Sequence, residues 1–458
     1  MTMLKLNGRP LHLFFSGIGG SGMSALAAFM HDRGHAVSGS DRAFDRNSNH
    51  PVGGILARKG ISLVPQDGNG ISPCLDLAVF STAVEPDRPE VVRARELGVP
   101  TATRPSFLAD LVNQFLTVAV AGTSGKSTTT GMLAFLMERL GLQPNFIGGG
   151  RVLQFESPSH LGNSLSGDSD LLVIEACESD GTIIDYIPDT SLVLNLDLDH
   201  HPVEETGGMF AHLAKRTTRL VITNADDHNL SMLGLRGHAA FSLQHTSDFR
   251  PDTFSLAGNG SDFSLRGVPF HLPLPGRHNL YNAIACIAVL SLMQVPLKEV
   301  SSALREFTGI ERRFAVHLDD GKRLIVDDYA HNPHKISSLM QTVSTMRDRV
   351  CYVFQPHGYG PTRLMREDYI RAFIRHLREE DHLVLLPIFY EGGTAKKDIS
   401  SEDLADEIGA AGKSVEAVHN RDSLLEKAAM WDAFVVFGAR DDSLADLARM
   451  MAGAMRGR

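Results

Sequence analysis

Apolar residues in this chain fall into two kinds of run. Short uninterrupted runs predict strands buried on both faces, and longer runs with apolar positions three or four apart predict helices. In the first hundred residues this pattern gives helices ending near 31 and covering 91–97, and strands at 11–15, 36–39, 75–80 and 100–103. A glycine-rich loop at 17–22 joins the first strand to the first helix. The chain therefore opens as a βαβ unit, and we predict that this first domain ends near residue 107.

A second strand, glycine loop and helix follow at 116–120, 122–127 and up to about 140. Beyond them we predict strands at 171–174, 191–195 and 220–223, a polar stretch at 247–268 and a long apolar helix at 280–292. The last part alternates amphipathic helices with strands at 323–328, 350–354, 382–387 and 433–437. This order predicts an α/β protein of three domains: Rossmann-like at 1–107, a central phosphate-loop ATPase domain at 108–310, and Rossmann-like at 311–458.

Composition excludes several classes of protein. Apolar residues make up 43% and charged residues 21% of 458, and no run approaches the about 20 apolar residues of a membrane span. A net charge of -10 without a long basic run argues against nucleic acid as the main partner. Four cysteines without CxxC spacing predict neither disulfides nor a zinc site. The N-terminus lacks the pattern of a signal peptide, so we expect a cytoplasmic protein without a membrane partner.

The loop at 122–127 carries the clearest chemistry. Its backbone N–H groups and the following helix N-terminus can hold phosphate oxygens. Lys126 would neutralise phosphate charge and Ser127 would hold Mg²⁺. The spacing departs from the usual GxxxxGK[ST] pattern, because Val120 stands where the first glycine would be. Taken alone, the segment is either a nucleotide site or a glycine-rich turn.

Further motifs, in order along nearly the whole chain, make the sequence resemble the Mur ligase superfamily. The loop itself is similar to that family's shortened GTxGK[ST]TT motif. The N-terminal GIGGSGMSALA is similar to that of the alanine-adding and tripeptide-recycling members. The other matching segments are EACESD at 175–180, NLDLDH at 195–200, GRHNLYN at 276–282, the pair Arg312-Arg313, and DDYAHNP at 327–333.

The resemblance implies ATP and Mg²⁺ as cofactors. The residues implied to bind ATP are Gly122, Thr123, Ser124, Gly125, Lys126, Ser127, Thr128, Asn279, Asn282, Arg313 and Asp328. In the family the two asparagines hold adenine, the arginine touches the phosphates and the aspartate the ribose, so closure of the third domain would complete the site. Without the resemblance, the asparagines could cap a helix and the other two could form a surface ion pair.

The metal and catalytic residues are also implied by the resemblance. Ser127, Glu175 and His200 correspond to the ligands of two Mg²⁺ ions, and the catalytic set is Lys126, Glu175, His200, Arg313 and His331. Position supports Glu175, because open α/β sheets bind ligands at the carboxyl ends of their strands. The plainer alternatives are a surface glutamate and a loop histidine.

The first glycine loop is interpreted as the cradle for the diphosphate of a UDP-sugar. The expected residues are Gly17, Ile18, Gly19, Gly20, Ser21, Gly22, Asp41 and Ser81. A dehydrogenase would also place an acidic residue about 20 positions after such a loop, and Asp41 could be mistaken for it. That oxidoreductase hypothesis leaves the loop at 122–127 without a role.

The amine end departs most from the family pattern. Alanine-adding members carry a QPHRYTRT-like segment, and here the run at 355–363 is QPHGYGPTR, so two arginines expected to bind the amino acid's carboxylate are missing. A later turn, GARD at 438–441, adds an arginine at a strand end. We expect His357, Arg363 and Arg440 to bind the amine substrate, with either arginine replacing the lost charge; the other outcome is a pocket rebuilt for another amine.

The resemblance thus implies an ATP-dependent ligase of peptidoglycan precursor synthesis. It would join L-alanine, or another amine, to UDP-N-acetylmuramate through an acyl phosphate, as a monomer or dimer. Three alternatives stay open from sequence: a relative with another amine substrate, such as a murein-tripeptide recycling ligase, an oxidoreductase, and a non-catalytic UDP-sugar sensor.

Overall fold

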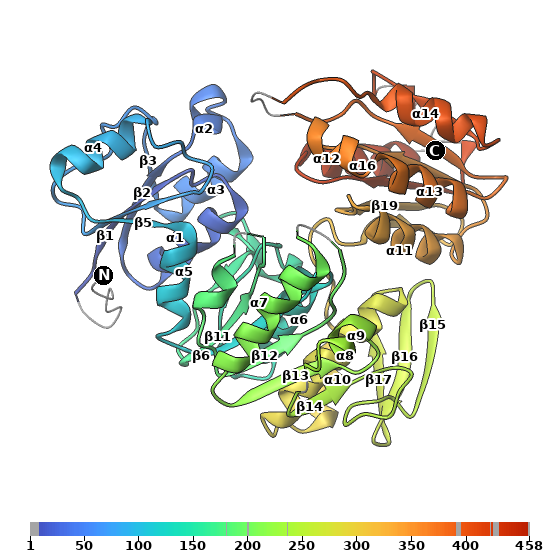
Figure 1. Cartoon of the computed structure of the whole chain (residues 1–458), viewed down its shortest axis with the longest axis horizontal. Helices are drawn as coiled ribbons and strands as arrows, with labels where there is room; N and C mark the ends of the chain where they lie inside the picture. The colour runs from blue at the N-terminus through green and yellow to red at the C-terminus, as the bar shows by residue number, and fades with distance from the viewer. Residues whose placement is uncertain are drawn as a thin grey trace. The chain divides into compact units, whose positions relative to one another are not determined.

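The computed structural model describes residues 9–179, 181–198, 201–235, 237–390, 395–421, 423–424 and 430–456. Figure 1 labels the helices and strands along the chain. The chain divides into two compact units. The first contains the chain up to Phe254, with Phe263–Pro273 and Asn279–Thr308. The second contains Gly309 onward, with the short segments Ser255–Asp262 and Leu274–His278.

The first unit begins with a five-stranded parallel sheet in the order β3-β2-β1-β4-β5. Its strands are β1 (His12–Ser16), β2 (Ala36–Ser40), β3 (Ser62–Leu63), β4 (Leu77–Phe80) and β5 (Thr101–Thr103). The associated helices are α1 (Ser21–Asp32), α2 (Arg42–Arg46), α3 (Pro51–Lys59), α4 (Pro89–Leu97) and α5 (Arg104–Val112). The strand order reverses between β1 and β4, and doubly wound sheets bind ligands at such a switch point.

The second sheet of this unit has the order β10-β7-β11-β6-β12-β13-β14 and is parallel except for the pair β10 and β7. Its strands are β6 (Leu116–Ala121), β7 (Asn145–Ile147), β10 (Ser164–Leu165), β11 (Leu171–Glu175), β12 (Thr190–Val193), β13 (Leu220–Asn224) and β14 (Ala239–Phe241). The phosphate loop follows β6, which lies between β11 and β12. The carboxyl ends of these three neighbours therefore meet at one edge of the sheet.

Helices and small elements complete this part of the unit. The helices are α6 (Lys126–Arg139), α7 (Val203–Arg216), α8 (His228–Met232), α9 (Arg277–Leu292) and α10 (Leu297–Leu304), with 3-10 turns at Leu153–Phe155 and Thr182–Asp185. A two-stranded ribbon pairs β8 (Glu156–Ser157) with β9 (His160–Leu161). Helix α6 is buried over Lys126–Met137, which explains why its sequence shows little amphipathic periodicity.

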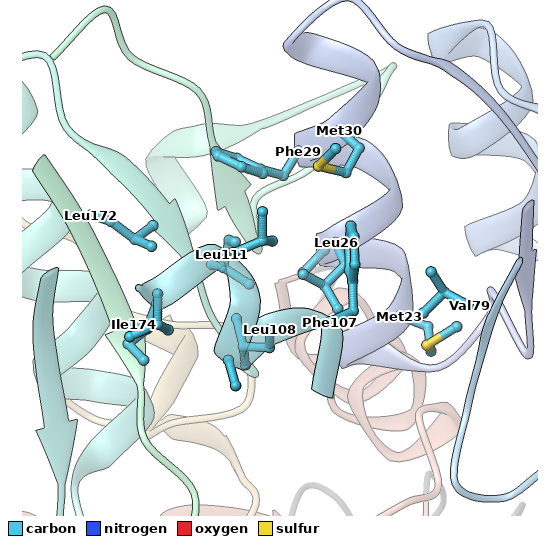
Figure 2. Close-up of a cluster of buried hydrophobic side chains, with 14 of the residues drawn as sticks. Met23, Leu26, Phe29, Met30, Val79, Phe107, Leu108, Leu111, Leu172 and Ile174 are labelled. Atoms are coloured by element: carbon cyan, nitrogen blue, oxygen red, sulfur yellow. The ribbon is translucent and has the colours of Figure 1, made fainter. Parts of the chain in front are cut away.

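Helix α5 joins the two sheets of the first unit into one core. Its side chains Phe107, Leu108 and Leu111 belong to the same buried cluster as Leu26 of α1 and Ile174 of β11. Figure 2 shows the α5 side chains between those of α1 and those of β11. The domain boundary predicted at residue 107 falls inside this helix.

A third sheet lies in the stretch that the sequence marked only as polar. It has the order β15-β16-β17, formed by β15 (Thr253–Ala257), β16 (Gly260–Leu265) and β17 (Val268–Leu272). Every residue of β15 is exposed, so no apolar alternation marks it in the sequence.

The second unit is built on a six-stranded sheet in the order β18-β19-β23-β20-β21-β22, parallel except for β18 with β19. The strands are β18 (Ala315–Asp319), β19 (Leu324–Asp328), β20 (Val350–Phe354), β21 (His382–Leu385), β22 (Val415–Ala417) and β23 (Ala433–Phe437). The helices are α11 (Pro333–Ser344), α12 (Tyr359–Leu364), α13 (Arg366–His376), α14 (Ser401–Ala410) and α16 (Ser443–Arg456). Two apolar clusters, one on each face of the sheet, form its core.

Within the described residues, no helix has both the length and the apolar character needed to span a membrane.

Candidate active site

The phosphate loop has a conformation that requires its glycines. Gly122 and Gly125 have φ values of 145° and 82°, which side chains other than glycine rarely adopt. A Cβ atom on Gly125 would lie 2.6 Å from Oδ1 of Asn282. The structure therefore brings Asn282, expected to hold adenine, against the loop expected to hold phosphate.

Asn195, just beyond β12, braces the loop. Its Oδ1 accepts hydrogen bonds from the Thr123 hydroxyl at 2.9 Å and the Ser124 amide at 2.8 Å. Its Nδ2 donates to the Ser124 carbonyl at 2.9 Å. This side chain fixes Thr123 and Ser124 from the neighbouring strand end, a role that sequence reasoning did not assign.

Lys126 opens α6 and is held at two places. Its Nζ donates to the Gly122 carbonyl at 2.5 Å and to both carboxylate oxygens of Glu178, at 2.9 and 3.1 Å. Burial opposes the charge of this lysine, but the nearby Glu178, Cys177 and Glu175 together raise its pKa. The group is therefore a buried ammonium ion, ready to bind an anion.

Two of the three expected metal ligands lie together. The hydroxyl of Ser127 donates to Oε1 of Glu175 at 3.1 Å, and the Gly149 amide donates to Oε2 at 3.1 Å. A carboxylate and a hydroxyl oxygen are ligands that suit Mg²⁺, so this pair fits such an ion. His200, the third expected ligand, lies outside the described residues. Thr128, also expected near the nucleotide, is buried in the first turn of α6.

The start of α9 carries Asn279 and Asn282, and both residues are buried. The hydroxyl of Tyr281 donates at 2.7 Å to Asp226, which lies beyond β13. The same carboxylate accepts the backbone amides of residues 243–245. Burial acts against ionisation of Asp226, yet these hydrogen bonds outweigh it and lower its pKa to about 2. Asp226 thus ties the start of α9 to the central sheet.

The first glycine loop lies at the switch point of the N-terminal sheet. Gly17 and Ile18 donate to the Ser40 carbonyl at 2.8 and 3.1 Å. Gly19 donates at 2.8 Å to Asp41, whose other oxygen caps α2 through the Ala43 amide. The carboxylate of Asp41 therefore holds the loop itself.

The rest of this loop faces the end of β4 and the start of α1. A Cβ atom on Gly17 would lie 2.9 Å from that of Ser81, so the two expected residues are neighbours. Gly20, Ser21 and Gly22 lead into α1, whose N-cap has no side-chain hydrogen bond. An uncapped helix N-terminus offers backbone N–H groups to an anion.

In the second unit, several expected residues gather at the carboxyl ends of the strands. Arg313 lies over the Tyr329 ring at 4.7 Å, and the ring of His331 lies 5.4 Å from that of Tyr329 and 5.3 Å from that of His357. Asp328 ends β19 and accepts the Phe314 amide at 2.7 Å. Burial raises the pKa of Asp328, while the charge of Arg313 acts in the opposite direction.

Arg312, adjacent to Arg313, is an anchor that the sequence analysis quoted without assigning a role. It is buried, with a φ of 56°, and it donates to the Gly438 carbonyl at 2.6 Å and to Asp327 at 3.3 Å. It therefore fixes the turn that presents Arg313 and, through Gly438, the start of the turn that carries Arg440.

The two arginines expected at the amine differ in their surroundings. Arg363 in α12 forms an ion pair with Asp398 and donates to the Lys396 carbonyl at 2.9 Å. Arg440 is exposed and has a φ of 69°. Among the residues that the structure describes, its guanidinium has no hydrogen-bond or ion-pair partner, so Arg440 keeps its charge available at the end of β23.

Comparisons with known proteins identify the family. Three family models match: "Mur ligase family, catalytic domain" at residues 12–116, "Mur ligase middle domain" at 120–290, and "Mur ligase, glutamate ligase domain" at 312–442. A UDP-N-acetylmuramate–L-alanine ligase of an Anaeromyxobacter species is 33% identical over 90% of each chain. One of Persephonella marina is 31% identical over 88% of this chain and 87% of its own.

The chain belongs to the Mur ligase family. A crystal structure of a UDP-N-acetylmuramate-alanine ligase from Thermotoga maritima, 26% identical, superposes with a TM-score of 0.81 and covers 98% of this chain and 99% of its own. The predicted family and the three-domain α/β fold are thereby confirmed. This Mur ligase is accordingly an ATP-dependent enzyme that forms amide bonds.

Proposed function

We propose that this Mur ligase joins L-alanine to the carboxylate of UDP-N-acetylmuramate, with ATP converted to ADP and phosphate. The observation that carries the proposal is its similarity, along about nine tenths of its length, to ligases named for that reaction. The site adds support, since Lys126, Ser127, Glu175 and Asn282 lie around one glycine loop as such a reaction requires.

The reaction needs an activated carboxylate, because joining a carboxylate to an amine in water is unfavourable. A carboxylate oxygen of the sugar nucleotide attacks the γ-phosphorus, the bond from phosphorus to the bridging oxygen breaks, and ADP leaves. The amine nitrogen then attacks the carbonyl carbon of the acyl phosphate. Phosphate departs with the C–O bond electrons, and the nitrogen loses a proton as the amide forms.

The residues act mainly by position and charge. Lys126 would neutralise the negative charge that moves between the phosphate oxygens, and the glycine-loop amides would hold those oxygens. Ser127 and Glu175 would hold Mg²⁺, which supplies charge neutralisation at the phosphates when bound. We assign Asn279 and Asn282 to adenine, and Arg313 and Asp328 to phosphate and ribose. His331, beside Tyr329, would complete the catalytic set.

The two other substrates would bind at the remaining strand ends. We assign the UDP diphosphate to the loop at Gly17–Gly22 with Ser81. Asp41 would contribute by holding this loop in shape, since its carboxylate accepts the Gly19 amide. We assign the amine to His357 and Arg440. Arg440 is favoured over Arg363 because Asp398 already pairs with Arg363.

The test is phosphate release from ATP with UDP-N-acetylmuramate and a panel of L-alanine, other amino acids and murein tripeptide. We expect release that needs both the sugar nucleotide and L-alanine. Release with the tripeptide and none with free L-alanine would assign the chain to murein recycling. No release with any amine would contradict a ligase function and leave the sensor hypothesis.

A further inference from the structure

We propose that Glu178 is a positioning residue for Lys126, holding its ammonium group in the phosphate cradle and away from the metal-binding carboxylate Glu175. This inference rests on the proposed ATP-dependent function. It concerns a side chain that the proposed mechanism leaves unused.

The first support is the geometry of the pair. Both oxygens of Glu178 accept hydrogen bonds from the Lys126 Nζ, at 2.9 and 3.1 Å. The side chains are 1% and 10% exposed, so Glu178 is almost wholly withdrawn from water. A buried carboxylate needs partners that satisfy both oxygens, and Lys126 is such a partner because its ammonium group donates to both.

The second support is that two glutamates of one short segment contact different partners. Glu175 and Glu178 are three residues apart, yet Glu175 faces Ser127 and Gly149 while Glu178 faces Lys126. The backbone of Glu178 is fixed where its carbonyl accepts the Gly181 amide at 2.9 Å. The two carboxylates therefore have different roles. Glu175 contacts Ser127, the other expected metal ligand, and Glu178 contacts the lysine.

The third support is what Lys126 would meet without Glu178. Glu175 is close enough to act on the lysine electrostatically, and an ammonium group without its partner would be drawn toward it. A lysine on Glu175 would compete with Mg²⁺ for the same oxygens and would leave the position where a phosphate arrives. Glu178 prevents this by supplying two acceptors of its own to the ammonium group.

The experiment compares Glu178→Gln and Glu178→Asp with the wild-type chain. Phosphate release is measured as ATP, UDP-N-acetylmuramate and Mg²⁺ are varied in turn. A matched control is Glu90→Gln, because Glu90 is also a fully buried carboxylate, bonded at 2.7 Å to the Ser40 hydroxyl and far along the chain from the phosphate loop. Thermal melting of each variant reports whether it is folded.

We expect Glu178→Gln to lower kcat by about tenfold or more, as loss of an aligned charge at a phosphate does, and to raise the half-saturating Mg²⁺ concentration about threefold or more. KM for UDP-N-acetylmuramate should stay within about twofold, and Glu178→Asp should recover part of kcat because it restores the charge. A purely structural residue would not change the Mg²⁺ requirement.

Two results would overturn the inference: a Mg²⁺ titration identical to wild type, or a loss in Glu178→Gln no larger than in Glu90→Gln. If Glu178→Gln does not fold, the binding of a fluorescent ATP analogue is measured instead. The single variant Lys126→Ala is compared with the double variant that carries both Lys126→Ala and Glu178→Asp. If Glu178 acts through Lys126, the double variant should bind the ATP analogue as the single variant does. A further loss of affinity in the double variant would overturn the inference. Failure of the proposed function is distinct, because it would appear as absent phosphate release in the wild-type chain.

Discussion

Lys126, which we assign to the phosphates, also stabilises the fold, because it neutralises a carboxylate withdrawn from water. We expect Lys126→Met to abolish turnover and to lower the free energy of unfolding by roughly 3–5 kcal/mol, the usual result of removing one partner of a buried ion pair. The double variant Lys126→Met, Glu178→Gln should regain most of that stability while staying inactive. Urea unfolding at neutral pH measures both; equal stability of the single and double variants would argue against a buried charged pair.

Arg440 occupies a backbone conformation that suits glycine. Replacement by alanine or by glycine removes the same guanidinium, and either should raise KM for L-alanine about tenfold, as expected when a charged hydrogen bond worth ~1.5–3 kcal/mol is lost. The glycine variant should be about 1 kcal/mol more stable than the alanine variant, because φ is 69°. Steady-state kinetics and thermal melting check the two statements. An unchanged KM for L-alanine with both variants would remove Arg440 from the amine site.

At the scale of single residues, the sequence predicted candidate chemical groups but not the side chains that hold them in place. Lys126 and Ser127 could be predicted as candidates because a glycine loop stands between a strand and a helix, and Glu175 because of its place at a strand end and the family resemblance. Asn195 and Glu178 stand in the quoted motifs, but their partners come from other strands, and such pairing depends on strand order rather than spacing. The pairing of Arg363 with Asp398 could not be foreseen for the same reason.

Among the elements, the phosphate loop allows two effects on ATP binding to be compared: a contact with the Asn282 side chain and strain in the backbone. Gly125→Ala should weaken ATP binding by about tenfold or more, because the added methyl group meets Asn282 and φ is unfavourable. Gly141→Ala is the control, since Gly141 has a similar φ of 73° and open space around its Cβ position. Calorimetric titration with ATP measures both. Equal losses in the two variants would mean that strain alone, without the Asn282 contact, explains the effect.

The hydrogen bond from Tyr281 of α9 to Asp226 predicts a contribution to the free energy of unfolding that is lost in acid. The pKa of Asp226 is about 2 in the folded chain, against 3.8 for an ordinary aspartate, a difference worth about 2 kcal/mol. Because the folded value is the lower one, this stability is present above pH 4 and is lost as the pH falls toward 2. Urea unfolding of wild type and Asp226→Asn should therefore differ most at pH 6, by roughly half as much at pH 3, and should converge only near pH 2 or below. A gap that stays constant with pH would contradict the assignment.

Most strands and long helices could be predicted because parallel strands and buried helices leave long apolar runs in the sequence. The sheet formed by β15, β16 and β17 could not, since β15 is exposed on both faces and carries no apolar alternation. Helix α5 was divided by the boundary predicted at residue 107. Proline and polar residues near 104–106 favour a break there, whereas the apolar contacts that continue the helix come from distant segments.

Across the whole molecule, the two compact units should respond differently to ligands. All residues assigned to the UDP diphosphate lie in the first unit. We expect calorimetry to show two unfolding transitions, and UDP at 100 times its dissociation constant to stabilise the first unit by about 2.7 kcal/mol without moving the other transition. A single transition, or an equal shift of both, would contradict independent unfolding of the units.

The core around α5 also bears on how such a chain can be recombined. Phe107, Leu108 and Leu111 each belong to a cluster with side chains from both sheets of the first unit. A chimera that took residues 1–107 from a relative would split this helix and mismatch both of its faces at once. The N-terminal and central sheets should therefore be inherited and exchanged together, as one evolutionary module, with the exchangeable joint beyond α10, where the second unit resumes at Gly309.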